Sequence, residues 1–157
     1  MTIRYNESIA TEIILSFDAR PEMLVQILHA FVARYTYISK EAVIQIANEL
    51  NLSRADVHGV VSYYHDFRTE PPGKRVVKIC QAESCQAMGS RSLTTHAEKV
   101  LGITMHQTTS DGETTLEPVY CLGNCACSPA VMIDNDVYGR VDSNKLDALL
   151  ANEGTNG

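Results

Sequence analysis

Hydrophobic residues in the first part of the chain recur at spacings of three and four, which predicts four short amphipathic helices between residues 6 and 68. Asn6, Ser39 and Ser53 each stand where the side chain of a helix N-cap would accept a backbone hydrogen bond. Pro21 suits the first turn of the second helix, because a backbone N–H would be unpaired there anyway. Such helices with brief connections favour a small bundle with no evident catalytic residues. The positions expected to face its core are Ile9, Ile13, Phe17, Leu24, Ile27, Leu28, Phe31, Tyr35, Val43, Ile46, Ala47, Leu50, Val57, Val60, Val61 and Tyr64.

Residues 69–73 (TEPPG) interrupt this pattern, since two prolines and a glycine end a helix. We place a domain boundary here, with a helical bundle at residues 1–70 and a second domain at residues 71–157. The pattern after it predicts the order β-α-β-β-β-β-α, a compact α/β domain of the size of thioredoxin, so the whole chain is expected to be α+β. The predicted strands are 75–80, 103–107, 114–120, 130–133 and 137–141. The predicted helices begin at a Ser90 cap, with Leu93, Ala97, Val100 and Leu101 facing inward, and at an Asp142 or Ser143 cap.

Four cysteines in two pairs follow predicted strands. Cys80 and Cys85 have the spacing C-x4-C, and Cys121 and Cys125 have the spacing C-x3-C. Thiolates are soft ligands suited to iron–sulfur clusters, zinc and Cu(I). The residues that follow each first cysteine are small or turn-forming, so their backbone N–H groups can point at sulfur and stabilise its negative charge. We therefore expect these four thiolates to hold a [2Fe–2S] cluster that carries one electron at a time.

Other interpretations of the cysteine pattern remain open at this point. A structural zinc site also uses four thiolates, although zinc pairs usually have the spacing C-x2-C. A dithiol oxidoreductase would show C-x-x-C, whereas Cys125 and Cys127 form C-x-C. The sequence also lacks the bacterial C-x2-C-x2-C run of a [4Fe–4S] site. Cys127 is expected to be a spare thiol packed beneath the cluster, and its alternative role is that of a replacement ligand.

Composition and charge narrow the class of protein. The 157 residues are 45% hydrophobic and 20% charged, which is enough apolar material for a packed core. The formal charge of -6 without a basic run argues against nucleic-acid binding. The first residues lack the apolar stretch of a secretory signal, and no apolar run approaches the roughly 18 residues of a membrane span. We therefore expect a soluble cytoplasmic protein, in which clustered cysteines more often bind metal than form disulfides.

The remaining candidate side chains have ordinary structural explanations. No histidine neighbours a cysteine as a Rieske centre would require. Tyr63 and Tyr64 are expected to be half-buried core residues, with a partner interface as the alternative. Lys78, Arg91 and Arg140 either temper the charge of the cluster or lie on the solvated surface. Surface or packing roles are expected for all five histidines, His29, His58, His65, His96 and His106.

Both parts of the chain resemble a known family. The pattern C-x4-C, then 35 residues, then C-x3-C, together with YCLGNCACSPAVMI, is similar to thioredoxin-like [2Fe–2S] ferredoxins. These include the small peripheral subunit of NADH:quinone oxidoreductase and its relatives in NAD-linked hydrogenases and formate dehydrogenases. The segment ILHAFVARYTYISKEAVIQIANELNLSRADVHGVVSYYHDF resembles the helical N-terminal region of the family, with Gly59 and the pair Tyr63 and Tyr64. The resemblance covers roughly residues 20–150.

This resemblance implies a site, a fold and partners. Cys80, Cys85, Cys121 and Cys125 would ligate one [2Fe–2S] cluster in a thioredoxin-like domain preceded by a helical bundle. FMN and NAD would bind to a partner flavin subunit, since this chain has neither a G-x-G-x-x-G nor a P-loop motif.

Within the family, CQAESCQAMGS and CLGNCACSPA look most like the gamma subunit of NAD-dependent molybdenum formate dehydrogenase. Cys127 favours that branch, because the respiratory subunits usually lack a cysteine there. That likeness implies a complex that converts formate and NAD+ to CO2 and NADH, with the molybdenum cofactor in a separate catalytic subunit. The equivalent subunit of NADH:quinone oxidoreductase or of an NAD-reducing hydrogenase is the alternative.

Overall fold

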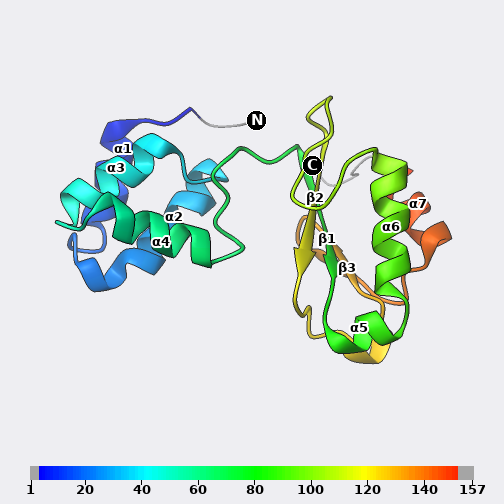
Figure 1. The fold of residues 1–157 in the computed structure, drawn as a ribbon. Helices are drawn as coiled ribbons and strands as arrows, with labels where there is room; N and C mark the ends of the chain where they lie inside the picture. Colours follow the sequence, from blue (N-terminus) through cyan, green and yellow to red (C-terminus); the bar gives the residue numbers. More distant parts are fainter. Residues whose placement is uncertain (1–3, 152–157) are drawn as a thin grey trace. The chain divides into compact units, whose positions relative to one another are not determined.

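The structure is a computed structural model, and it describes residues 4–151 (Figure 1). Contacts along the chain divide it into two compact units, which meet at the bond between Pro72 and Gly73. We call them unit 1, before this bond, and unit 2, after it. The boundary predicted at residues 70 and 71 lies close to the division. That the two parts fold as independent domains stays a prediction.

Unit 1 is helical, as the capping residues predict. The side chains of Asn6 and Ser39 accept hydrogen bonds from the third backbone N–H after each of them, and Ser53 forms a capping box with Asp56. Pro21 begins a short 3-10 turn that leads into the second long helix. The elements are α1 (Glu7–Leu15), η1 (Pro21–Met23), α2 (Leu24–Tyr35), α3 (Lys40–Glu49) and α4 (Arg54–Tyr63).

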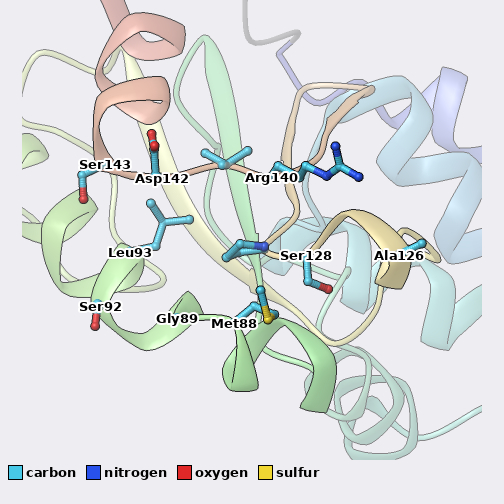
Figure 2. Close-up of a pocket in the computed structure, with 11 residues that line it drawn as sticks. Met88, Gly89, Ser92, Leu93, Ala126, Ser128, Arg140, Asp142 and Ser143 are labelled. Carbon is cyan, nitrogen blue, oxygen red and sulfur yellow. The ribbon is translucent and has the colours of Figure 1, made fainter.

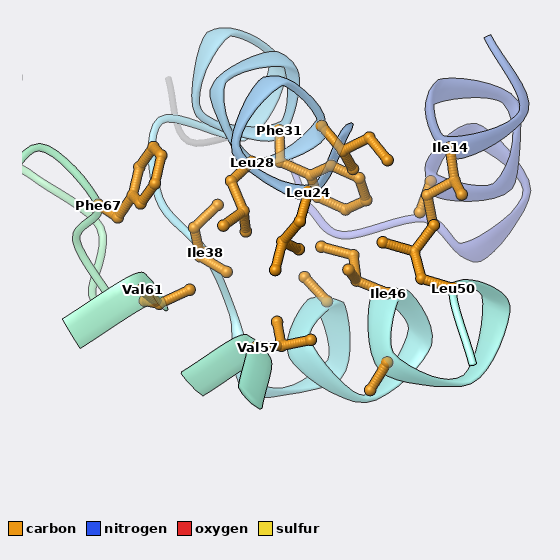
Figure 3. Packing of buried hydrophobic residues seen from close by; sticks show 14 of the residues in the cluster. Ile14, Leu24, Leu28, Phe31, Ile38, Ile46, Leu50, Val57, Val61 and Phe67 are labelled. Atoms are coloured by element: carbon orange, nitrogen blue, oxygen red, sulfur yellow. The ribbon is translucent and has the colours of Figure 1, made fainter. Parts of the chain in front are cut away.

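The core of unit 1 forms where these helices meet. Phe31 of α2, Ile46 of α3 and Val57 of α4 point into it (Figure 3). Each large apolar side chain buried here contributes about 1.5–3 kcal/mol. All five positions predicted on α2 are buried: Leu24, Ile27, Leu28, Phe31 and Tyr35.

Two predictions for unit 1 are wrong in detail. On α1 the fully buried residues are Ala10 and Ile14, because this helix packs against both α2 and α3. The predicted Ile9 and Ile13 pack against the core but are only partly buried, as is Phe17, which lies beyond the end of the helix. Helix α4 ends at Tyr63, and Tyr64 adopts an extended backbone. Tyr63 is 76% exposed and Tyr64 is 41% exposed, so neither is the half-buried core residue that we expected.

Unit 2 contains a four-stranded sheet in the order β2-β1-β3-β4. Strand β1 runs parallel to β2 and antiparallel to β3, and β3 and β4 form a hairpin. Helices α6 and α7 lie on one side of the sheet (Figure 1). The elements are β1 (Arg75–Cys80), α5 (Glu83–Ala87), α6 (Ser90–Leu101), β2 (Thr114–Val119), η2 (Cys125–Cys127), β3 (Val131–Ile133), β4 (Asp136–Tyr138) and α7 (Ser143–Ala151).

The core of unit 2 lies between the sheet and its two long helices. Val77 and Ile79 of β1 are fully buried, as is Leu116 of β2. Leu93 of α6 and Leu146 of α7 pack onto them from the helical side. The strands β1 and β2 and both long helices, all predicted from the sequence, therefore form one apolar core, which holds the ends of β1 and β2 in place. The predicted α+β fold is confirmed.

Several local predictions for unit 2 are wrong. Residues 103–107 do not form a strand, because His106 has a φ of 68° that breaks an extended chain. Helix α5 was not expected. Ser90 does not cap α6. Gly89, with a φ of 100°, takes the N-cap position instead. Val100 is 51% exposed and does not face inward. Over residues 4–151, no helix combines the length and the apolar character that crossing a bilayer would require.

Candidate metal centre

The two cysteine pairs meet at one edge of the sheet. Strand β1 ends at Cys80, and its parallel neighbour β2 ends at Val119, the register partner of Cys80. The backbone N–H of Gln81 donates to the Val119 carbonyl at 2.7 Å, so the two strands leave the sheet together. Helix α5, which carries Cys85, follows β1, and the segment with Cys121 and Cys125 follows β2. Parallel strands thus bring pairs 35 residues apart in sequence to the same place.

The two pairs differ in burial. Cys80 and Cys85 are each 2% exposed, and they pack against Ala130 in a small apolar cluster. Cys121 and Cys125 are exposed. A group held by all four sulfur atoms would therefore have one buried side and one side at the surface of unit 2.

Hydrogen bonds and burial shape the first pair. Burial raises the pKa of Cys80, although the backbone N–H of Ala82 acts in the opposite direction, and the neighbouring Cys85 thiol raises it further. Burial alone would also raise the pKa of Cys85, but the Ser128 hydroxyl, the Ala130 backbone N–H and the Cys80 thiol together lower it below its usual value. Both sulfur atoms thus receive backbone N–H groups that stabilise negative charge.

The second pair lies in a tight loop. Gly123 has a φ of 70°, a conformation that costs glycine little. This turn lets the Gly123 N–H donate to Cys121 Sγ at 3.3 Å. The nearby Cys121 thiol is the main cause that raises the pKa of Cys125, followed by partial loss of hydration, and Cys85 adds a smaller contribution. The hydroxyl of Ser84, the residue before Cys85, donates to the Cys125 carbonyl at 3.2 Å, so the second pair lies next to the first.

Polar side chains fix the backbone around the first pair. The buried Ser90 hydroxyl donates to the Cys80 carbonyl at 2.5 Å. Gln86 Nε2 donates to the Gln81 carbonyl at 2.6 Å. Arg91 donates to Gln86 Oε1 through two nitrogen atoms, at 3.0 and 2.7 Å. Arg91 thus supports the loop through Gln86.

Ser84 and Ser128 join the two cysteine segments, although neither serine stands out in the sequence. Their hydroxyl oxygens lie 2.8 Å apart. Ser84 Oγ donates to the Cys125 carbonyl at 3.2 Å, and Ser128 Oγ donates to the same carbonyl at 2.9 Å. Cys85 Sγ lies 3.5 Å from Ser128 Oγ. Local patterns could not reveal this contact, because 44 residues separate the two serines.

A cleft of about 480 Å³ opens beside these residues. Figure 2 shows Ser128 and Ala126 at one end of it and Asp142 and Ser143 at the other. Arg140 also lines the cleft. The sequence singled out three basic residues as candidates to lie near the cluster. Arg140 lies near η2, Arg91 lies near α5, and Lys78 lies within β1.

Cys127 occupies the last position of η2 and is half-buried. Its backbone N–H donates to the Asn124 carbonyl at 3.0 Å, and its own carbonyl accepts from the Arg140 N–H at 2.6 Å. These bonds hold the backbone of Cys127 against the strand hairpin. The role of its thiol stays a prediction.

The contacts of three of the five histidines are typical of surface and packing residues. His29 packs edge-on against Phe67, with 4.9 Å between ring centroids. His96 Nε2 lies 2.7 Å from Asp147 Oδ1 and links α6 to α7. His106 Nδ1 lies 2.8 Å from Glu117 Oε2 on β2.

The donor set fits a binuclear cluster. Such a cluster takes two thiolates at each of its two irons. The thiols here are grouped as Cys80 with Cys85 and as Cys121 with Cys125. The chemistry and the pairing of the sulfur atoms are those that a [2Fe–2S] cluster needs.

Comparison with known proteins identifies the family. Residues 10–153 match the family described as thioredoxin-like [2Fe-2S] ferredoxin. The chain belongs to this family. Members of this family carry one [2Fe–2S] cluster, which agrees with the cofactor that the cysteine pattern of this chain predicted.

Two relatives are subunits of NADH-quinone oxidoreductases. The relative from Rhizobium meliloti (strain 1021) is 40% identical over 106 residues, which cover 68% of this chain and 63% of that protein. The relative from Pseudomonas aeruginosa (strain PAO1) is 37% identical over 114 residues, or 73% of this chain and 69% of that protein. The match thus spans less than two thirds of the length of the Rhizobium protein.

A solved structure shares the fold. The crystal structure of an NAD+-reducing [NiFe]-hydrogenase in the air-oxidized state matches with a TM-score of 0.68 and 24% sequence identity. That match covers 82% of this chain and 22% of the hydrogenase chain. It supports the arrangement of secondary structure described above.

Proposed function

We propose that Cys80, Cys85, Cys121 and Cys125 ligate one [2Fe–2S] cluster, and that the chain is an electron-transfer subunit of an NAD-linked oxidoreductase complex. The observation that carries this proposal is the meeting of two thiol pairs where the parallel strands β1 and β2 end. When bound, the cluster accepts and returns one electron at a time.

The residues of the chain prepare this site in three ways. Cys80 and Cys85 keep water away from one side of the cluster, because both are buried. Backbone N–H groups, such as that of Gly123 on Cys121 Sγ, stabilise the negative charge of the sulfur atoms. Cys121 and Cys125 are exposed, so an electron can enter or leave through the surface of unit 2.

The relatives indicate the kind of complex. They are subunits of NADH-quinone oxidoreductases, and the hydrogenase that shares the fold reduces NAD+. We therefore propose first that the chain is a subunit of an NADH-quinone oxidoreductase or of an NAD-reducing hydrogenase. Its partner subunit would bind flavin and NAD, and the complex would be cytoplasmic. These relatives favour it over the formate dehydrogenase assignment. The latter stays a narrower second candidate, supported by Cys127 and by the likeness of both cysteine segments.

Reduction by NADH tests the proposal directly. The chain has no G-x-G-x-x-G motif, so NADH should leave the isolated protein oxidised. NADH should reduce the cluster once the flavin-binding partner from the same organism is added. Formate should do so only if a molybdenum subunit completes the complex. Reduction of the isolated chain by NADH, or failure of the reconstituted complex to reduce it, would contradict the proposal.

A further inference from the structure

Two serine hydroxyl groups, those of Ser84 and Ser128, connect the cysteine segments beside the buried pair. The direction of their hydrogen bonds depends on whether Cys85 is a thiol or a metal-bound thiolate. Ser128 is 8% exposed, so few waters reach it. Its oxygen lies within hydrogen-bond distance of Ser84 Oγ, of the Cys125 carbonyl and of Cys85 Sγ. A hydroxyl has one proton to donate, so Ser128 serves one of these acceptors at a time.

While Cys85 is a thiol, its S–H donates to Ser128 Oγ at 3.5 Å. The Ser128 hydroxyl then donates its proton to the Cys125 carbonyl, with 2.9 Å between the two oxygen atoms. Thiols lose their protons when they bind metal. A metal-bound Cys85 sulfur can only accept, and the Cys85–Ser128 hydrogen bond must reverse or be lost.

Ser84 makes the reversal possible. Its hydroxyl lies 3.2 Å from the Cys125 carbonyl and 2.8 Å from Ser128 Oγ, so its proton can serve either oxygen. The Cys125 carbonyl thus keeps a donor when Ser128 turns away from it.

We propose that Ser128, assisted by Ser84, donates a hydrogen bond to the Cys85 sulfur in the cluster-bound protein and raises the reduction potential of the cluster. This inference rests on the proposed function and assigns a positioning role to two residues that ligate nothing. The bond strengthens when the cluster gains an electron, because the sulfur atoms then carry more negative charge. One electron is taken up from the partner or from a chemical reductant, and the hydroxyl proton stays on Ser128.

The test is a reductive titration of the cluster-loaded protein, followed by EPR. Ser128→Ala should shift the one-electron equilibrium about threefold to tenfold toward the oxidised form, which corresponds to a midpoint potential about 30–60 mV lower. Ser84→Ala should shift it in the same direction by less, because Ser128 must then also serve the Cys125 carbonyl. Ser128→Thr retains the hydroxyl and should restore the wild-type potential.

Ser92→Ala is the matched control, because Ser92 lines the same cleft but belongs to no contact described above. Its potential should equal that of the wild type. A Ser128→Ala potential equal to that of Ser92→Ala overturns the inference. If Ser128→Ala fails to take up iron, the Ser84→Ala variant provides the test instead. A midpoint potential of Ser84→Ala equal to that of the wild type then overturns the inference.

Deuterium exchange gives a second measurement, which detects the hydroxyl proton itself and is not altered by a change in side-chain packing alone. In D2O, pulsed EPR of the reduced wild-type protein should show a strongly coupled exchangeable deuteron that Ser128→Ala lacks and Ser92→Ala keeps. An identical deuteron signal in both variants contradicts the inference. A protein without iron and sulfide would instead contradict the proposed function, so the two failures are distinguishable.

Discussion

Gly139 lies against Cys127 so closely that a Cβ at position 139 would be 2.6 Å from the Cβ of Cys127. The same atom would lie 2.8 Å from Asn124 Nδ2. The next residue, Arg140, donates its N–H to the Cys127 carbonyl. The end of the β3–β4 hairpin thus fixes the position of η2, and η2 carries Cys125.

Gly139→Ala is therefore expected to displace η2 and loosen the metal site. Overpacking of this kind costs about 1–3 kcal/mol. We expect a lower midpoint of chemical denaturation and faster bleaching of the visible absorption in the presence of a chelator. Gly59 on α4 provides the control, since a Cβ there meets no atom within 4 Å.

Gly59→Ala should stabilise unit 1, because alanine is the better helix former by about 0.5–1 kcal/mol. The midpoint of the helical CD transition is the measurement. Visible absorption should stay at the wild-type level. If Gly139→Ala bleached no faster than Gly59→Ala, the hairpin would not be what positions η2.

The five cysteines should separate into four ligands and one spare thiol. Serine at Cys80, Cys85, Cys121 or Cys125 is expected to weaken or remove the cluster, because a hydroxyl is a poor replacement for a soft thiolate. Cys127→Ser should keep the wild-type absorption and EPR spectra. A bleached Cys127→Ser protein would show that Cys127 takes part in ligation, and the assignment would then be wrong.

Removal of the cluster should affect unit 2 alone. Metal-binding energy is part of the folding energy of the segments that supply the ligands. Unit 1 has its own core, built from α1 to α4 and from residues no later than Phe67. After chelation, hydrogen exchange should accelerate over residues 75–150 and stay unchanged over residues 6–66. One shared thermal transition of the metal-free chain would contradict the predicted division into independent domains.

Tyr5 should give unit 1 a sensitivity to alkaline pH. Burial, with smaller contributions from Tyr35 and nearby glutamates, raises its pKa to about 12, and its hydroxyl donates to Gln45. A raised pKa means that folding favours the neutral phenol, so its contribution is complete below about pH 10 and is lost as pH rises through about 12. Between these values, Tyr5→Phe should lose less stability than the wild type in urea denaturation. If the free energy of unfolding fell equally steeply with pH in the wild type and in Tyr5→Phe, the proposed role of Tyr5 would be contradicted.

Local signals in the sequence were sufficient for much of the fold. The caps at Asn6, Ser39 and Ser53 were correct because an N-cap depends on residues within one turn. Strand β1 was predicted with its observed bounds, since the RVVKIC run precedes clear loop residues. The backbone near both cysteine pairs was harder. Helix α5 is five residues long, too short to show a helical repeat.

The contacts that complete the site could not be predicted from local sequence. The Ser90 position suggested a cap, yet its hydroxyl reaches the Cys80 carbonyl ten residues earlier. Ser84 and Ser128 look like ordinary loop residues until β1 and β2 bring their segments together. The spacing of the cysteines indicated the metal, whereas the hydrogen bonds around the sulfur atoms depend on the tertiary structure.

Analysis of iron and acid-labile sulfide, combined with EPR, decides whether the four paired thiols hold a [2Fe–2S] cluster. We predict about two irons and two sulfides per chain, a reddish-brown oxidised protein without an EPR signal, and an EPR signal on one-electron reduction. One zinc per chain with no sulfide, in a colourless protein that stays EPR-silent, would contradict the assignment.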